Sequence, residues 1–244
     1  SKKKPQYFLF YFFLINTKTG FVFFCVVIMS ELPDDLFQPF ELDEAKKALL
    51  RILWGAFKKI VIANRLAVFV NAGYANPSEL SGVSAILVIV FFVIQLYCDF
   101  SGYCDMAIGS ARLLGFKLSE NFTRPLLAKN IKTVYQRWHI TIHRWFRDYV
   151  YFSLKKPNTN FRRGFNILLV FGLAGLWHGS GLNFLFWGLI NGFLIMTLDP
   201  VIDFATAKRN KLLIITTLLS GHAAVYLSLV FFRSSDLAHA FQIF

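Results

Sequence analysis

The sequence predicts an all-α, polytopic integral membrane protein built from transmembrane, re-entrant and interfacial amphipathic helices. Of its 244 residues, 56% are hydrophobic and 16% are charged, whereas soluble domains carry about 25% charged residues. The mean hydropathy is +0.51. Long stretches without charged side chains alternate with basic ones, as in membrane spans and their cytoplasmic loops. This composition argues against a soluble globular protein.

The net charge of +12 would suit a nucleic-acid-binding protein only if it covered a solvated face of a soluble fold. Here the Lys and Arg side chains lie between apolar runs, so we expect no nucleic-acid partner. Residues 112–163 hold twelve Lys and Arg against two acidic residues. We therefore expect this region to be cytoplasmic or interfacial, in contact with membrane lipid.

The N-terminal part, residues 1–43, is expected to form a membrane segment followed by an acidic, proline-containing loop. Residues 7–29 are apolar apart from a polar island at 16–20, which fits one interrupted span or two short re-entrant pieces. Residues 44–70 mix basic and large apolar side chains, a pattern typical of interfacial helices. The remaining chain, 44–244, forms the second predicted domain.

Three further apolar stretches predict membrane helices. Leu80–Cys98 has close to the roughly 20 residues that a span requires. Residues 165–198 contain no Lys, Arg, Asp or Glu, but a single helix of that length would run roughly 50 Å, beyond a hydrocarbon core of about 30 Å. A break is therefore predicted at His178–Gly181. The last span is expected over Leu212–Phe232.

Residues 131–149 predict one amphipathic helix. At 100° per residue its apolar side chains share an arc of about 120°. A second, polar row beside that arc consists of Lys132, Gln136, His139, His143 and Arg147. Two histidines four residues apart can share a zinc ion, but Ile140 stands where a zinc protease motif has its Glu, and no third ligand is evident. We expect no metal, and interpret His143 as an interfacial polar residue.

His178 is the one titratable side chain in the apolar stretch 165–198. Ionisable residues inside membranes are costly and usually functional. Desolvation disfavours the imidazolium form, so we expect a neutral ring that can accept a proton. The alternative is a structural histidine that bonds a carbonyl at the helix break. Gly175, Gly179 and Gly181 are expected to let a substrate approach the ring.

The segment Asp99–Asp105 is interpreted as closing the preceding membrane helix with two acids and a flexible Ser-Gly pair. It either shapes a cavity mouth or pairs with nearby basic residues. Glu120–Pro125 is interpreted as a turn.

Six short motifs together resemble the membrane-bound O-acyltransferase family: Tyr97–Tyr103, Glu120–Phe122, Arg137–Thr141, Trp145–Tyr149, Leu176–Gly179 and Phe231–Arg233. The nearest branch looks like the bacterial alginate O-acetylation proteins, with the teichoic-acid D-alanyl transfer protein as a cousin. The resemblance implies a helical membrane core with a tunnel in which an activated acyl group meets its acceptor. Residues 44–244 would be the catalytic core, the C-terminal half of a usual member.

The resemblance also implies a multi-pass protein of the cell inner membrane that moves an acyl group, acetyl by expectation, to hydroxyls of an exported polysaccharide. The donor would be acetyl-CoA or another acyl thioester, a co-substrate and not a tightly bound cofactor. An extracytoplasmic polysaccharide acyltransferase would be the partner. The family's invariant histidine maps onto His178 and its second motif histidine onto His139.

Substrate-binding roles are expected for residues of the same motifs: Asp99, Tyr103, Asn121, Arg137, Trp138, Arg147 and Trp177. His178 would be the general base and His139 would orient or polarise one reactant. The basic residues from Lys129 to Arg147 would hold the phosphates of coenzyme A. Two rival functions are a transporter or channel with an intramembrane histidine, and a non-catalytic membrane scaffold.

Overall fold

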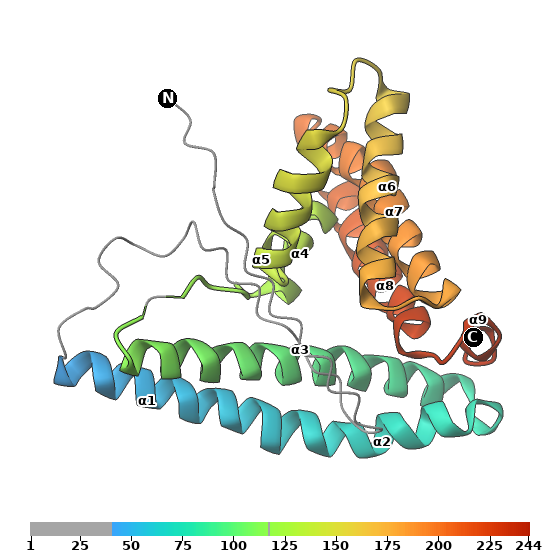
Figure 1. Cartoon of the computed structure of the whole chain (residues 1–244). Helices are drawn as coiled ribbons and strands as arrows, with labels where there is room; N and C mark the ends of the chain where they lie inside the picture. Colours follow the sequence, from blue (N-terminus) through green and yellow to red (C-terminus); the bar gives the residue numbers. More distant parts are fainter. Residues whose placement is uncertain (1–40, 117) are drawn as a thin grey trace, which may run out of the picture. The chain divides into compact units, whose positions relative to one another are not determined.

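A computed structural model describes residues 41–116 and 118–244 (Figure 1). Within these ranges the chain forms helices and loops without a strand, which confirms the all-α prediction. The α-helices are α1 (Leu42–Ala56), α2 (Asn64–Ala75), α3 (Gly82–Leu113), α4 (Ile131–Arg137), α5 (Ile140–Trp145), α6 (Asn160–His178), α7 (Leu182–Ala207), α8 (Lys211–Arg233) and α9 (Leu237–Phe241). The predicted membrane segment at 7–29 lies outside the described residues.

Three of the described helices, α3, α7 and α8, are long and apolar enough to cross a membrane. The break predicted at His178–Gly181 is confirmed, because α6 ends at His178 and α7 begins at Leu182. Helix α8 confirms the predicted last span.

The interpretation of Asp99–Asp105 as the end of a membrane helix is wrong. Helix α3 continues through both acids to Leu113. It can do so because the carboxylates are neutralised by basic side chains of the preceding helical segment, as described below.

The chain forms two compact units. The described part of the first consists of residues 41–65 and Gln95–Phe122. Here small residues bring two helix backbones close together: a Cβ on Gly55 would meet the backbone oxygen of Gly102, and one on Gly109 would meet that of Ala48. Close contact of small residues is a common basis of helix pairing in membranes.

Ion pairs join the same helices of the first unit. Arg51 donates to Asp105 at 2.9 Å and to Glu120 at 2.6 Å. Lys58 pairs with Asp105 at 2.6 Å, and Lys59 pairs with Asp99. Lys58 and Lys59 lie in a π-helical segment, Phe57–Ala63, between α1 and α2. The two carboxylates bonded to Arg51 raise its pKa, chiefly through the hydrogen bond to Glu120.

The second unit consists of Leu66–Ile94 and Thr123–Phe244. In it, α6 packs against α7 and α7 against α8, while α4 contacts both α7 and α8 (Figure 1). Glycines permit the first of these contacts, since a Cβ on Gly175 would meet the backbone oxygen of Phe184 and one on Gly188 that of Phe171.

The single amphipathic helix predicted over 131–149 is wrong. Helix α4 ends at Arg137, and His139 adopts a left-handed backbone with φ 44° and ψ 55° before α5 begins. The chain continues as a π-helical segment, Phe146–Val150. The 100° projection cannot foresee this break, because no glycine or proline marks it.

Candidate active site

Three histidines approach one another in the second unit. His139, at the junction of α4 and α5, is 3% exposed. Its ring centroid lies 6.3 Å from that of Trp177 on α6, and the Trp177 ring lies 4.8 Å from that of His178. The backbone N–H of His143 donates to the carbonyl of His139 at 3.2 Å. The rings of the two histidines predicted to be catalytic therefore both contact one tryptophan.

His178 lies among aromatic rings from three helices. Trp187 of α7 and Phe232 of α8 meet its ring nearly at right angles, with centroids 5.3 Å and 5.0 Å away. Apolar surroundings of this kind favour the neutral imidazole, which is the form that accepts a proton. His178 remains partly exposed.

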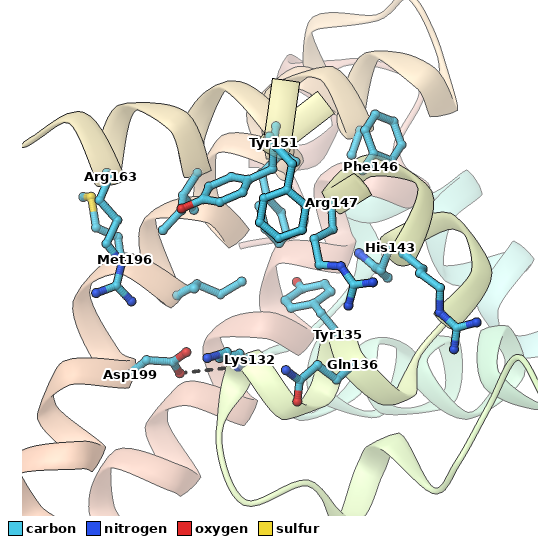
Figure 2. A pocket seen from close by; sticks show the side chains of 18 of the residues that line it. Lys132, Tyr135, Gln136, His143, Phe146, Arg147, Tyr151, Arg163, Met196 and Asp199 are labelled. Atoms are coloured by element: carbon cyan, nitrogen blue, oxygen red, sulfur yellow. Dashed lines mark hydrogen bonds between the residues drawn. The ribbon is translucent and has the colours of Figure 1, made fainter. Parts of the chain in front are cut away.

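A cavity of about 870 Å³ lies beside this cluster, between α4, α5, α6 and α7. Figure 2 shows its wall, with Arg163 and Met196 on one side and His143 on the other. Four basic side chains line it: Lys132, Arg144, Arg147 and Arg163. Asp199 is the acidic residue of the lining, and its carboxylate accepts a hydrogen bond from the backbone N–H of Lys132 at 3.3 Å.

The apolar part of the cavity follows one face of α6. Gly164, Ile167, Phe171 and Ala174 line it at intervals of three or four residues, so they share that face. The next position of the series is His178, one turn beyond Ala174. His178 and His139 are not among the lining residues, whereas His143 is.

Most residues of the polar row predicted from the sequence line the cavity. Lys132, Gln136, His143 and Arg147 all line it, although the helix that should carry them is broken. The fifth member, His139, is the residue at the break, and its ring contacts Trp177 instead.

Burial controls the protonation of the two histidines at α5. It lowers the pKa of His139 well below its ordinary value, and the neighbouring His143 and His178 lower it further. Burial also lowers the pKa of His143 to about 4. Both rings are therefore neutral at pH 7, so each offers one donor and one acceptor nitrogen.

The expectation that the glycines near His178 leave room for a substrate is wrong. A Cβ on Gly175 or Gly179 would meet Phe184, and one on Gly181 would meet the side-chain oxygen of Asn183. These glycines instead permit the tight turn and close packing between α6 and α7.

Three of the predicted substrate-binding residues belong to the first unit and are not among the residues that line the cavity. Asp99 is paired with Lys59, which fits the ion-pair interpretation of that motif. Asn121 is 3% exposed, and its amide lies 3.5 Å from the sulfur of Cys104. Tyr103 is 40% exposed.

The other four predicted substrate-binding residues belong to the second unit. Arg147 lines the cavity, where Asp148 binds its guanidinium at 2.7 Å and 3.1 Å. Trp177 lies in the histidine cluster. Arg137 and Trp138 end α4 and are absent from the lining; the carbonyl of Arg137 accepts from the backbone N–H of Thr123.

Sequence reasoning missed several cavity residues. From the sequence, His143 is interpreted as an interfacial polar residue, although its place in the polar row is the signal that identifies it as a cavity residue. Tyr135 is one of the side chains in the apolar arc of the helix predicted over 131–149, and that position does not predict a place in the cavity wall. Arg163 and Asp199 carry no local motif, and only the packing of α6 on α7 brings them to the cavity.

The fold and the site together define a class of protein. It is a helical membrane protein in which a cluster of neutral histidines lies beside a basic cavity. Its sequence matches the profile of the membrane-bound O-acyltransferase family over residues 5–234. The chain therefore belongs to that family.

The names of three relatives refer to different polymers. Peptidoglycan O-acetyltransferase of Helicobacter pylori is 37% identical over 195 residues, covering 78% of this chain and 36% of that protein. A probable alginate O-acetylase of Pseudomonas aeruginosa is 33% identical over 205 residues, covering 83% and 38%. Teichoic acid D-alanyltransferase of Bacillus subtilis is 37% identical over 112 residues, covering 43% and 28%. The chain thus spans between 28% and 38% of the length of these relatives.

Proposed function

We propose that this chain is the catalytic core of an O-acyltransferase of the inner membrane, which moves an acetyl group from a thioester such as acetyl-CoA towards hydroxyls of an exported polysaccharide. The observation that carries the proposal is the pairing of His139 and His178 around Trp177, one helical turn beyond a basic cavity. The names of the relatives support the reaction class and suggest a cell-surface polymer as acceptor.

His178 acts as general base in this proposal. The hydroxyl of the acceptor is a weak nucleophile, so a neutral imidazole nitrogen removes its proton as the oxygen attacks the thioester carbonyl. A new C–O bond forms, the C–S bond breaks, and the departing thiolate takes the proton from the imidazolium. His139, whose ring also contacts Trp177, polarises or orients one reactant.

The cavity supplies the donor site. Lys132, Arg144, Arg147 and Arg163 suit the phosphates of a coenzyme A thioester, because Lys and Arg form strong charge-assisted hydrogen bonds with phosphate oxygens. The acceptor reaches the histidines from the other side of the membrane, and an extracytoplasmic acyltransferase passes the group to the polymer.

The test compares His178→Ala with His222→Ala in cells that carry the protein. His222 is a matched control, since it is a histidine of α8 whose ring nitrogen bonds its own helix at Leu218. Loss of a general base typically costs about 10²–10⁴-fold in rate. We expect ester-linked acetate on the envelope polymer to fall at least 100-fold in His178→Ala and to stay normal in His222→Ala, with equal membrane abundance.

Unchanged acetylation in His178→Ala, at normal membrane insertion, would favour a non-catalytic scaffold. Measuring acetate separately on the exported polysaccharide and on peptidoglycan identifies the acceptor.

A further inference from the structure

His143 is a titratable residue of the cavity wall that the mechanism above does not use. Its ring meets Tyr135 edge-on, with centroids 5.1 Å apart, and lies 6.3 Å from Phe171. Within residues 41–116 and 118–244, neither ring nitrogen of His143 forms a hydrogen bond. The ring is half-buried on the cavity wall, so its nitrogens keep hydrogen-bonding capacity for a ligand in the cavity.

A buried polar network fixes the orientation of this wall. The hydroxyl of Tyr135 donates to the side-chain oxygen of Asn191, which is fully buried in α7. The Asn191 amide donates to Ser228 of α8 at 3.0 Å and to the carbonyl of Trp187 at 2.7 Å. Side chains held by packing and by a surrounding hydrogen-bond network are preorganised for binding. Tyr135, and the His143 ring against it, meet this condition.

The position of His143 suits the uncharged part of a donor. The basic side chain of Arg163 lies on the opposite side of the cavity (Figure 2). Phe171 lies against the His143 ring, and Arg144 and Arg147, which also line the cavity, follow His143 along the chain, so His143 lies where the basic and apolar parts of the lining meet. A neutral imidazole in such a place attracts no phosphate, but it can donate to a carbonyl or accept from an amide.

We propose that His143 binds the amide- or carbonyl-bearing arm of the acyl thioester by a direct hydrogen bond and so holds its acyl end towards His139 and His178. This inference rests on the function proposed above. His143 is a donor-binding residue and takes no part in proton transfer.

The experiment measures equilibrium binding of radiolabelled acetyl-CoA to membranes that carry the full chain with His178→Ala, so that turnover does not deplete the probe. His143→Phe keeps the ring volume and removes both nitrogens, while His143→Asn restores a donor and an acceptor. A net hydrogen bond contributes about 0.5–1.5 kcal/mol. We therefore expect about two- to ten-fold weaker binding in His143→Phe and a smaller loss in His143→Asn. His222→Phe serves as the control and should bind as the parent does.

Parental affinity in His143→Phe would overturn the inference while leaving the proposed function intact. Equal weakening in the Phe and Asn variants would also overturn it, because that pattern reports ring packing alone. If membranes with intact His143 bind no acetyl-CoA, the donor site itself is wrong and this inference fails with it. Turnover in the His178→Ala comparison remains a separate test of the base.

Discussion

Ala174 and His178 lie one turn apart on the same face of α6, and of the two it is Ala174 that lines the cavity. The small side chain of Ala174 thus leaves space in the cavity wall nearest to the proposed base. A change there alters the space for the donor without touching the imidazole.

Ala174→Phe is expected to fill this end of the cavity and to reduce acyl transfer about ten-fold or more, because a displacement of about 1 Å in the reacting groups can cost 100-fold. Leu173→Phe is the matched control, since Leu173 precedes Ala174 on the chain, is 40% exposed and does not line the cavity. Transfer rates per unit of membrane protein provide the comparison. Similar rates in the two variants would contradict a donor site in this cavity.

Arg163→Gln is expected to raise the KM for acetyl-CoA several-fold, with a smaller effect on kcat. Arg163 lines the cavity, whereas the adjacent Arg162 does not, so Arg162→Gln controls for loss of one charge. Added salt screens charge attraction. It should therefore reduce the difference in KM for acetyl-CoA between Arg163→Gln and the parent. A KM shift of the same size in both variants would indicate a general surface effect.

Asn191→Leu is expected to destabilise the protein by about 1–3 kcal/mol, because it leaves the buried hydroxyl of Tyr135 without its partner. It also removes the bond from Asn191 to Ser228, whose hydroxyl keeps its bond to the carbonyl of Val225. Thr197→Val, on the same helix, removes a hydroxyl that bonds only its own turn, and should change stability by less than about 0.5 kcal/mol. Thermal unfolding in detergent measures both. If Asn191→Leu and Thr197→Val had equal melting temperatures, the hydrogen-bond network around Asn191 would not support the cavity wall at Tyr135.

Arg51→Met is expected to destabilise the first unit by about 2 kcal/mol, since it removes charge-assisted hydrogen bonds to two carboxylates. Lys46→Met breaks an exposed pair with Asp43, and such pairs contribute about 0–1 kcal/mol. Protease resistance of the membrane-embedded protein should fall in Arg51→Met alone. A matching loss in Lys46→Met would argue against a special role for the Arg51 pairs.

Helix length and charge predicted much of the fold. The stretch 165–198 is too long for one span, and the glycines after His178 located its break correctly. The end of α3 could not be predicted in the same way. Two acids in an apolar helix suggest that the helix ends there, unless distant Lys58 and Lys59 supply the opposite charge. Those ion pairs join residues 40 or more positions apart.

The candidate site was predicted in part for a similar reason. The helical projection grouped His143 and Arg147 correctly, since each lies on a segment with local helical spacing. It placed His139 in the same row because it assumed one unbroken helix. The turn at His139 depends on the contact of its ring with Trp177 and on the bond from Thr123 to the end of α4, which are tertiary features.

The backbone at His139 has a consequence for anyone who engineers this protein. An L-residue in the left-handed region carries a cost of roughly 1–2 kcal/mol, from which glycine is exempt. Ranking substitutions by backbone ease would thus nominate glycine at position 139 and discard the imidazole beside Trp177. A search for thermostable variants should therefore leave His139 unchanged, because backbone stability favours glycine at this position whereas the proposed chemistry requires the imidazole.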